Sequence, residues 1–478
     1  MPCRTAHGRT ADFFPGDSGM PKHGSAIAGW AVAAAATALF CAPAFTGADA
    51  GPFRTAAVVL LTMGLLATGA LPEYLTSLLF FLFAMAFAIA PPHVVFSGFA
   101  TSTLWLVFGG LIVAEAVNST GLGSRVAAAV LGRITLSYTR LIGLAVAFST
   151  VLAFFMPATL GRILLLLPLF SAIAVQAGLT PGGKAHNGVC LAVIMTTYQC
   201  GTAILPANTP NLVLTGAAEN LYGQHISYAE YLLVQFPVMG LVKAALIFGL
   251  ICLLMQEDIR QPGAQAPHGP VRPEELRLAA ILLGSLALWA TDFVHGIQPG
   301  WIALGAGVLC LLPRVGVIPL AALNERVRLG PVFYIAAILG LGATISETGL
   351  ATDIGSRLSK VLDLRQGHDF LNFMVLATMS SVAGLLTTNP VQPALLTPLA
   401  AQLAEAMDWP LKATLMSFAL GFTTMILPYQ VPPVAVGLQI AGLPLRAALR
   451  FTVPLALISL LVLVPLDYAW WKLIGYLP

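Results

Sequence analysis

Two proline-interrupted motifs hold the polar residues of this chain that are best suited to binding a small solute. The letters ILP at residues 204–206 are followed by PN at 210–211, and ILP at 426–428 is followed by PP at 432–433. Each motif interrupts an apolar stretch and follows an apolar hairpin with a polar tip. Non-helical backbone at membrane depth is stable only where protein or a water-filled cavity pairs its polar groups. Two such breaks at matching places in two halves are typical of a transporter that binds its substrate near the bilayer midplane.

The two hairpin tips and the two breaks provide hydrogen-bonding side chains that we expect to meet near the bilayer centre. The expected substrate-binding residues are Thr159, Arg162, Asn208, Thr209, Asn211, Thr388, Asn389, Tyr429 and Gln430. A helix that restarts after a break presents free amide groups, which favour anions, whereas a helix that stops presents free carbonyls, which favour cations. The motifs therefore predict a site for a small anion that could hold a cation beside it.

Arg162 is a single charge inside an apolar hairpin arm, just after the first tip. Because a charge at the centre of a membrane helix costs about 2.5–3.5 kcal/mol on insertion scales, it needs a partner. A guanidinium can bind a carboxylate through two parallel hydrogen bonds, so substrate contact is one interpretation. The other is pairing with a carbonyl or extension to the interface, and the sequence favours neither. Lys243, in the middle of another span, is expected to be structural.

No Asp or Glu lies in either expected tip or break. Glu115, Glu347 and Asp467 lie nearer the ends of their spans, where interfacial carboxylates are expected, so no proton relay of midplane carboxylates is predicted. The histidines between residues 93 and 368 fall in expected loops, which argues against an intramembrane hydrolase. The sequence also lacks zinc-protease and phosphate-loop motifs, so we expect a protein that is neither an enzyme nor driven by ATP.

The composition is that of a membrane protein. The chain has 478 residues, of which 58% are hydrophobic and 9% are charged, whereas soluble domains carry roughly 25% charged residues. Apolar runs long enough to cross a lipid bilayer recur from residue 25 to residue 471. The expected fold class is therefore an all-α polytopic membrane protein. The formal net charge of +3 is small, so no nucleic-acid binding is predicted.

Matching segments predict an inverted structural repeat with about 11 transmembrane spans, two re-entrant hairpins and two broken helices. The expected parts are a cytoplasmic tail at 1–24, an extra span at 25–50, a first repeat at 51–255, a cytoplasmic linker at 256–273 and a second repeat at 274–478. The hairpins, with arms too short to cross the bilayer, are expected at 141–178 and 370–406, and the broken helices at 187–218 and 411–440. Met20 is a second candidate start of translation.

Loop charges predict which end of each span faces the cytoplasm. Placing the N-terminus inside leaves few basic loop residues outside, namely Arg54, Arg357, Lys360, Arg365, Lys412 and Lys472. Cytoplasmic loops carry an excess of Lys and Arg, so this orientation is the expected one. The predicted location is the cell inner membrane with a cytoplasmic N-terminus, and the second half then begins from the opposite side to the first.

At the tips and breaks the chain resembles the divalent anion/sodium symporter family, within the ion transporter superfamily. The strongest segments are ATLGRILLLLP at 158–168, GTAILPANTPN at 201–211, TNPVQPALLTP at 388–398 and ILPYQVPP at 426–433. The family typically carries Ser-Asn-Thr at both tips for contacts to carboxylates and sodium. Here the first tip reads Pro157-Ala158-Thr159 and keeps only the threonine, whereas the second keeps Asn389 and has Thr388 in place of the serine.

The resemblance implies a homodimer in which a transport domain moves past a static scaffold. It implies succinate, citrate and related carboxylates as substrates, with sulfate in some branches. It also implies a sodium ion as the coupling ion and no other cofactor, and the candidate cation-binding residues are Thr202, Thr387, Thr388 and Asn389. The changed first tip implies weak sodium dependence in that half.

We therefore predict a cation-coupled secondary active transporter that moves a small anion, foremost a di- or tricarboxylate, by elevator-type alternating access. A permease for sulfate, arsenite or another inorganic anion is the first alternative, and proton coupling is the second. A membrane-embedded enzyme is the rival from another class. The sequence does not select the anion, the coupling stoichiometry or the direction of transport.

Overall fold

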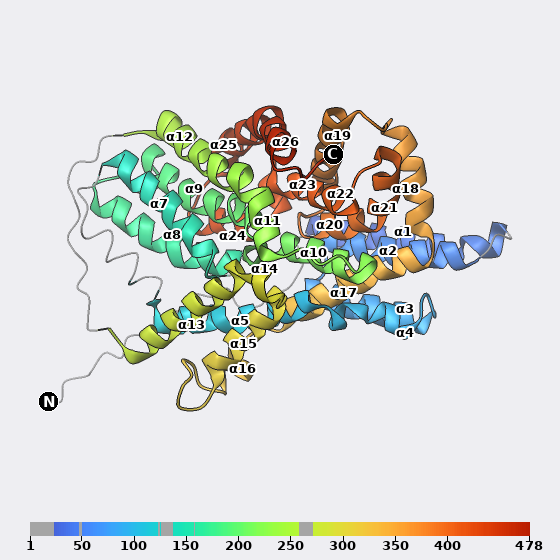
Figure 1. The fold of residues 1–478 in the computed structure, drawn as a ribbon, viewed down its shortest axis with the longest axis horizontal. Coiled ribbons are helices and arrows are strands. Elements are labelled where there is room, and N and C mark those ends of the chain that lie inside the picture. The colour runs from blue at the N-terminus through green and yellow to red at the C-terminus, as the bar shows by residue number, and fades with distance from the viewer. Residues whose placement is uncertain (1–22, 47–49, 123–124, 126–136, 157, 258–270) are drawn as a thin grey trace.

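The computed structural model describes residues 23–46, 50–122, 125, 137–156, 158–257 and 271–478, and these residues form helices without any strand (Figure 1). Within them, eight helices are long and apolar enough to cross a membrane, and four shorter apolar helices have 10–17 residues. The prediction of an all-α multi-pass membrane protein is therefore confirmed, while the full span count stays a prediction. Most of the expected tail and linker, and Pro157 at the first tip, lie outside the described residues.

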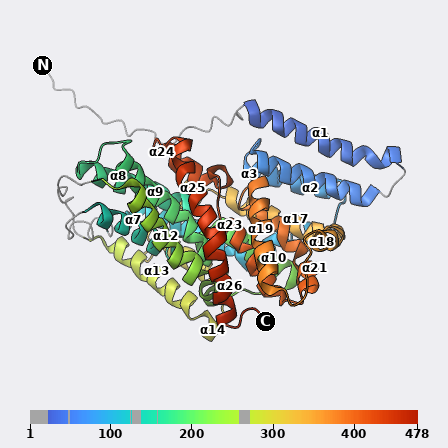
Figure 2. The ribbon, with the colours of Figure 1, turned by 90° about the horizontal axis from the view of Figure 1, so that it is seen from above.

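The first part of the described chain consists of six helical elements. They are α1 (His23–Thr46), α2 (Ala50–Thr68), α3 (Glu73–Ala86), α4 (Pro92–Val95), the 3-10 turn η1 (Ser97–Ala100) and α5 (Ser102–Thr120). α1 packs along α2 at the periphery (Figure 2). Helix α5 ends at Gly121, whose φ of 70° is a left-handed conformation that glycine adopts without steric cost.

The first hairpin and the first break follow. The hairpin consists of α7 (Tyr138–Ala153) and α8 (Thr159–Gln176), and α9 (Lys184–Gln199) comes next. The chain then passes through two 3-10 turns, η2 (Gly201–Ala203) and η3 (Leu205–Ala207), before α10 (Thr209–Tyr222) begins. Pro206 and Pro210 explain the interruption, because proline lacks an amide donor and disfavours helical geometry in the preceding residue. Helix α8 has 18 residues, which is longer than the short arm expected and sufficient to span a membrane.

A continuous helix ends the first half, and a run of helices opens the second. The continuous helix joins α11 (Tyr228–Gln235), the π-helical segment η4 (Phe236–Val242) and α12 (Lys243–Met255). The second half begins with α13 (Pro273–Ala290), α14 (Asp292–His295), α15 (Pro299–Leu311), α16 (Ala322–Glu325) and α17 (Gly330–Glu347).

Helix α18 (Leu350–Val361) lies between α17 and the second hairpin. Its buried residues Ala351 and Gly355 are four positions apart, whereas Asp353, Arg357 and Lys360 are exposed. Residues three and four apart share one face of a helix, so this pattern produces one packed face and one polar face.

The last helices repeat the order of the first half. The second hairpin consists of α19 (Asp369–Leu386), α20 (Val391–Leu396), the 3-10 turn η5 (Thr397–Leu399) and α21 (Ala400–Met407). The second broken helix consists of α22 (Leu411–Ser417), α23 (Ala419–Thr423), the 3-10 turn η6 (Pro428–Gln430) and α24 (Pro432–Ile440). The chain ends in α25 (Leu445–Ile458), the π-helical segment η7 (Ser459–Leu463) and α26 (Val464–Leu473).

Each hairpin packs against the helix that restarts after the break in the other half. Helix α8 contacts α24, and α20 contacts α10, so the two halves interlock at the breaks (Figure 1). Elsewhere the backbones of α5 and α15 pack closely against each other. A Cβ added to Gly300 would lie only 2.0 Å from the Ser102 carbonyl oxygen. Small residues permit such close helix packing in membranes.

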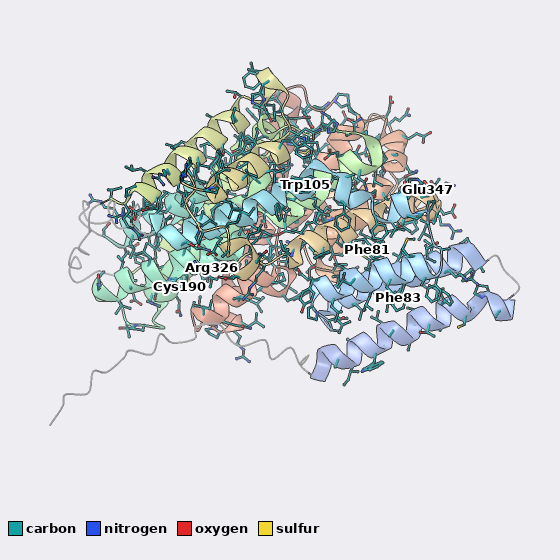
Figure 3. All side chains as sticks on the ribbon, turned by 90° about the horizontal axis from the view of Figure 1, so that it is seen from below. Phe81, Phe83, Trp105, Cys190, Arg326 and Glu347 are labelled. Atoms are coloured by element: carbon teal, nitrogen blue, oxygen red, sulfur yellow. The ribbon has the colours of Figure 1, made fainter. Side chains whose placement is uncertain are left out.

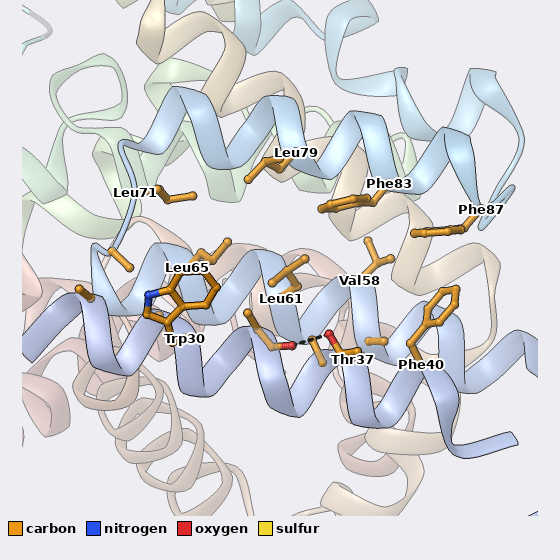
Figure 4. Close-up of a pocket in the computed structure, with 16 residues that line it drawn as sticks. Trp30, Thr37, Phe40, Val58, Leu61, Leu65, Leu71, Leu79, Phe83 and Phe87 are labelled. Carbon is orange, nitrogen blue, oxygen red and sulfur yellow. Dashed lines mark hydrogen bonds between the residues drawn. The ribbon is translucent and has the colours of Figure 1, made fainter. Parts of the chain in front are cut away.

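An apolar groove of about 610 Å³ lies between α1, α2 and α3 (Figure 4). Its lining includes Trp30, Phe40 and Phe83, and the Thr37 hydroxyl donates to the Ala33 carbonyl at 2.8 Å. Phe81, also on α3, is instead buried in the core (Figure 3). The groove therefore presents hydrocarbon, and the polar groups that suit an anion lie elsewhere.

Candidate functional site

The first tip is fastened to the first break by Thr159. This residue begins α8, and its hydroxyl lies 3.2 Å from the Ala207 carbonyl oxygen and 3.1 Å from Oδ1 of Asn208. All three residues are buried. The structure therefore brings together two of the predicted binding residues, Thr159 and Asn208, that are 49 positions apart in the chain.

Arg162 is completely buried, one turn after Thr159. Its Nη1 donates to the Met156 carbonyl, and its Nη2 donates to the Thr197 carbonyl at 3.0 Å and lies 3.4 Å from the Thr159 hydroxyl. Met156 precedes the tip, and Thr197 belongs to the last turn of α9. The sequence left two interpretations of Arg162, contact with the substrate or pairing with a carbonyl. In this structure the guanidinium pairs with carbonyls. Its Nε has no hydrogen-bond partner among the described residues.

Asn211 holds the first break together from the start of α10. Its Nδ2 donates to the carbonyls of Gly201 at 3.2 Å and Ile204 at 2.8 Å. Two of the amide atoms stay free in the described part of the chain, Oδ1 of Asn211 and Nδ2 of Asn208. Thr209, the first residue of α10, is partly exposed. The break thus leaves a buried amide donor beside a helix N-terminus, an arrangement that suits an anion.

The second tip and second break are joined by Asn389 and Gln430. The Asn389 backbone amide donates to the Gln430 carbonyl at 2.8 Å, and the Gln430 Nε2 lies 3.4 Å from Oδ1 of Asn389. Oε1 of Gln430 accepts from the amides of Ile426 at 2.8 Å and Leu427 at 2.7 Å. Gln430 therefore replaces the helical hydrogen bonds that the break removes.

Tyr198 connects the two halves and was not among the predicted site residues. Its hydroxyl accepts from Nδ2 of Asn389 at 2.6 Å and donates to the Phe422 carbonyl at 2.9 Å. Nδ2 of Asn389 also donates to Phe422, at 3.0 Å. Tyr198 stands at the end of α9, just before the first break, so the two breaks share one hydrogen-bonded cluster. A tyrosine close to a break was the only sequence signal for this role.

The remaining predicted residues are more dispersed. Tyr429 is 53% exposed, and its hydroxyl donates to the Leu385 carbonyl at 2.5 Å. The Thr387 hydroxyl donates to the Ala383 carbonyl at 2.8 Å, and Thr388 beside it is half-buried. Thr202 lies in the first break instead, where its hydroxyl donates to the Gln199 carbonyl at 2.6 Å.

Lys243 binds the backbone at the second break, although the two are far apart in the sequence. This residue is completely buried, and its ammonium donates to the carbonyl of Thr423, the last residue of α23. The sequence expectation of a structural lysine did not include this partner. Each broken helix therefore has a buried basic side chain near the point where its first segment stops.

Two sequence expectations about ionisable residues are wrong. Asp467 was expected near the membrane interface, but it is completely buried. His186 was expected in a loop, but it lies in the first turn of α9, where its Nε2 is 2.9 Å from the Ser171 hydroxyl. In the described part of the chain, no group of three or more His, Cys, Asp or Glu side chains could hold a metal ion.

Comparisons with known proteins show which family this chain is similar to. The sequence is 23% identical to the chloroplastic dicarboxylate transporter 2.2 of Arabidopsis thaliana, over 87% of this chain and 79% of that protein. It is 22% identical to the L-tartrate/succinate antiporter of Escherichia coli, over 78% of this chain and 79% of that protein. The solved structure of the Alcanivorax borkumensis YdaH transporter shares the fold with a TM-score of 0.55 at 15% identity, covering 78% of this chain and 85% of that one.

The family assignment rests on a match along nearly the whole chain. The sequence model described as the sodium:sulfate symporter transmembrane region matches residues 26–477. The family and these relatives are transporters, so the predictions of a transporter and of a protein that is not an enzyme are confirmed. The chain thus belongs to the sodium:sulfate symporter family, as its tips and breaks had suggested.

Proposed function

We propose that this protein is a secondary active transporter of a small dicarboxylate across the inner membrane. The observation that carries the proposal is the buried polar cluster in which Tyr198 and Asn389 join the two breaks inside an otherwise apolar protein. Two relatives are named for dicarboxylates and for tartrate and succinate, which supports the same substrate class. Sulfate, which the family description names, is the second candidate.

The arrangement suits an anion with two separated charges. The first break contributes the free Nδ2 of Asn208 and the N-terminus of α10. The second contributes the amide side chains of Gln430 and Asn389, because α24 begins with Pro432 and Pro433, which carry no amide N–H. Helix N-termini and amide donors stabilise carboxylates. We therefore assign one carboxylate of the substrate to each half, a division that a compact ion such as sulfate cannot use.

The residues present do not fit sodium well. In the first half the Arg162 guanidinium already binds the Met156 and Thr197 carbonyls, which a cation would otherwise use. In the second half Lys243 already binds the Thr423 carbonyl. The hydroxyls of Thr202 and Thr387 donate to backbone carbonyls rather than facing a shared cation position. We propose that these buried charges stabilise the anion site, and that transport proceeds by anion exchange or with protons.

The proposed movement is alternating access of a core that contains both hairpins and both broken helices. The repeated order of elements and the interlocked contacts of α8 with α24 and α20 with α10 support a core that moves as one body. The close α5–α15 pair would belong to the static scaffold. A homodimer with cytoplasmic N-termini completes the proposal, as the family resemblance and the loop charges imply.

Counterflow in proteoliposomes tests this function. Vesicles loaded with unlabelled succinate should accumulate labelled succinate or tartrate without any sodium present, and unlabelled sulfate should compete poorly. The Asn389→Asp variant places a negative charge inside the cluster and should lose this activity while staying folded. Uptake of labelled sulfate alone, or a strict requirement for sodium, would contradict the proposal.

A further inference from the structure

Two completely buried charges, Lys243 and Asp467, lie beside corresponding irregularities of the fold. Lys243 directly follows the π-helical segment η4, and Asp467 is the fourth residue after the π-helical segment η7. The two segments lie within the last long helix of the first and second halves, and they contact each other. π-helical turns are rare and occur frequently at functional sites. Their pairing here brings a lysine and an aspartate from different halves into one region.

Lys243 links this region to the proposed anion site. Its ammonium donates to the Thr423 carbonyl at the end of α23. The preceding carbonyl, that of Phe422, accepts from both Tyr198 and Asn389. A displacement of the ammonium would therefore alter the end of α23 directly beside the cluster that joins the two breaks.

Asp467 has no hydrogen-bond partner for either carboxylate oxygen among the described residues. The Lys243 ammonium lies near enough to interact with this carboxyl group through charge, although the two do not form an ion pair. The indole Nε1 of Trp471, one turn further along α26, is the donor that acts on this carboxyl group, although the two do not form a hydrogen bond of ordinary geometry within the described structure. An ionised carboxylate buried away from water is strongly unfavourable, whereas a protonated carboxylic acid is neutral.

The other charged groups near α26 are paired with one another at the helix ends. Asp369 of α19 binds Lys472 at 2.9 Å, and Glu230 of α11 binds Lys412 at 3.1 Å. The hydroxyl of Tyr476 also bonds to Glu230, at 2.9 Å. The segments η4 and η7 carry no ionisable side chain. In the described structure, the charge that acts on Asp467 is therefore that of Lys243, whose ammonium also lies near the Cys200 thiol.

We propose that Asp467 is a proton-binding site, and that its proton is taken up together with the transported anion. With the proton on a carboxylate oxygen, Asp467 is neutral and Lys243 stays on the Thr423 carbonyl, where its charge favours an anion. When the proton leaves, the ionised Asp467 attracts the ammonium away from Thr423 and weakens the anion site. Proton and anion binding then strengthen each other reciprocally. This inference rests on the proposed transport of an anion.

Equilibrium binding of succinate to purified protein over a range of pH tests the linkage. The affinity should fall by up to about tenfold per pH unit as Asp467 loses its proton, since one proton is linked to binding. The isosteric Asp467→Asn variant should bind with an affinity that does not change with pH, and Lys243→Met should also lose the pH dependence. The matched control Asp369→Asn changes a carboxylate at a helix end and should keep the wild-type profile.

Infrared difference spectra recorded during a pH titration test the proton site without any substrate. The wild type should show the C=O band of a protonated carboxylic acid that disappears in Asp467→Asn and persists in Asp369→Asn. If that band is unaffected by Asp467→Asn, or if Asp467→Asn keeps the wild-type pH dependence of binding, the proposal is refuted. Absence of succinate binding at every pH would instead refute the proposed substrate, and the infrared result would still decide the proton site.

Discussion

Replacing Arg162 with methionine tests whether its guanidinium takes the place of a cation at the first break. In the wild type the guanidinium binds the carbonyls of Met156 and Thr197. Methionine keeps an unbranched apolar stem but leaves both carbonyls without these donors. Each unpaired buried group costs about 1–3 kcal/mol, so the loss of stability is about 2–6 kcal/mol for the pair. Part of this loss is offset because the variant no longer buries an arginine charge.

The vacated carbonyls should now accept a small hard cation, because such cations bind oxygen ligands. We therefore expect sodium, but not an equal concentration of choline, to raise the melting temperature of Arg162→Met in detergent. A ligand present at a hundred times its Kd stabilises the folded state by about 2.7 kcal/mol, which would recover much of the loss. The wild type should show no such sodium effect.

Arg162→Lys is the matched control, since it keeps one charge but loses the fork that reaches two carbonyls. Its free energy of unfolding should fall by about 1–3 kcal/mol, because one carbonyl stays unpaired, and sodium should not change its melting temperature. The assay is thermal unfolding of each purified variant, followed by tryptophan fluorescence with sodium or choline chloride. An Arg162→Met variant as stable as the wild type, with no response to sodium, would refute the role assigned to Arg162.

Three further predictions concern the cluster, the scaffold and the tip. Tyr198→Phe removes two hydrogen bonds of about 0.5–1.5 kcal/mol each, so the affinity for succinate should fall by up to about two orders of magnitude. Unchanged affinity in a binding assay would contradict the role of the cluster in substrate binding. Gly300→Ala should lower the free energy of unfolding by about 1–3 kcal/mol in thermal unfolding, because the new Cβ would lie 2.0 Å from the Ser102 carbonyl oxygen. The control Gly305→Ala, on the same helix, should be neutral, because its Cβ would meet no atom within 4 Å. Thr388→Cys should react with a thiol reagent, and saturating succinate should protect it; labelling that ignores succinate would place the substrate away from the second tip.

The breaks could be predicted from the sequence because proline acts locally. Pro206, Pro210, Pro428 and Pro432 each remove an amide donor, so the ends of the helical segments follow from the chain itself. Apolar runs likewise predict spans, since bilayer thickness sets their length. The pairing of Thr159 with Asn208 was also accessible, because a hairpin followed by a broken helix must bring the tip near the break.

Contacts between distant segments could not be predicted in this way. Tyr198 and Asn389 are 191 residues apart, and Lys243 and Thr423 are 180 apart, so only the packing of the two halves brings them together. Asp467 illustrates the same limit. Its position near the end of a long span indicates a carboxylate at the membrane interface. The contact between α26 and η4 instead buries it within the protein.

A structure determined with bound succinate tests the central claim most directly. The account predicts one carboxylate within hydrogen-bond distance of Asn208 and the N-terminus of α10. It predicts the other at Asn389 or Gln430, with the Arg162 guanidinium still on the carbonyls of Met156 and Thr197. Succinate bound entirely within one half, or in the apolar groove between α1, α2 and α3, would contradict it.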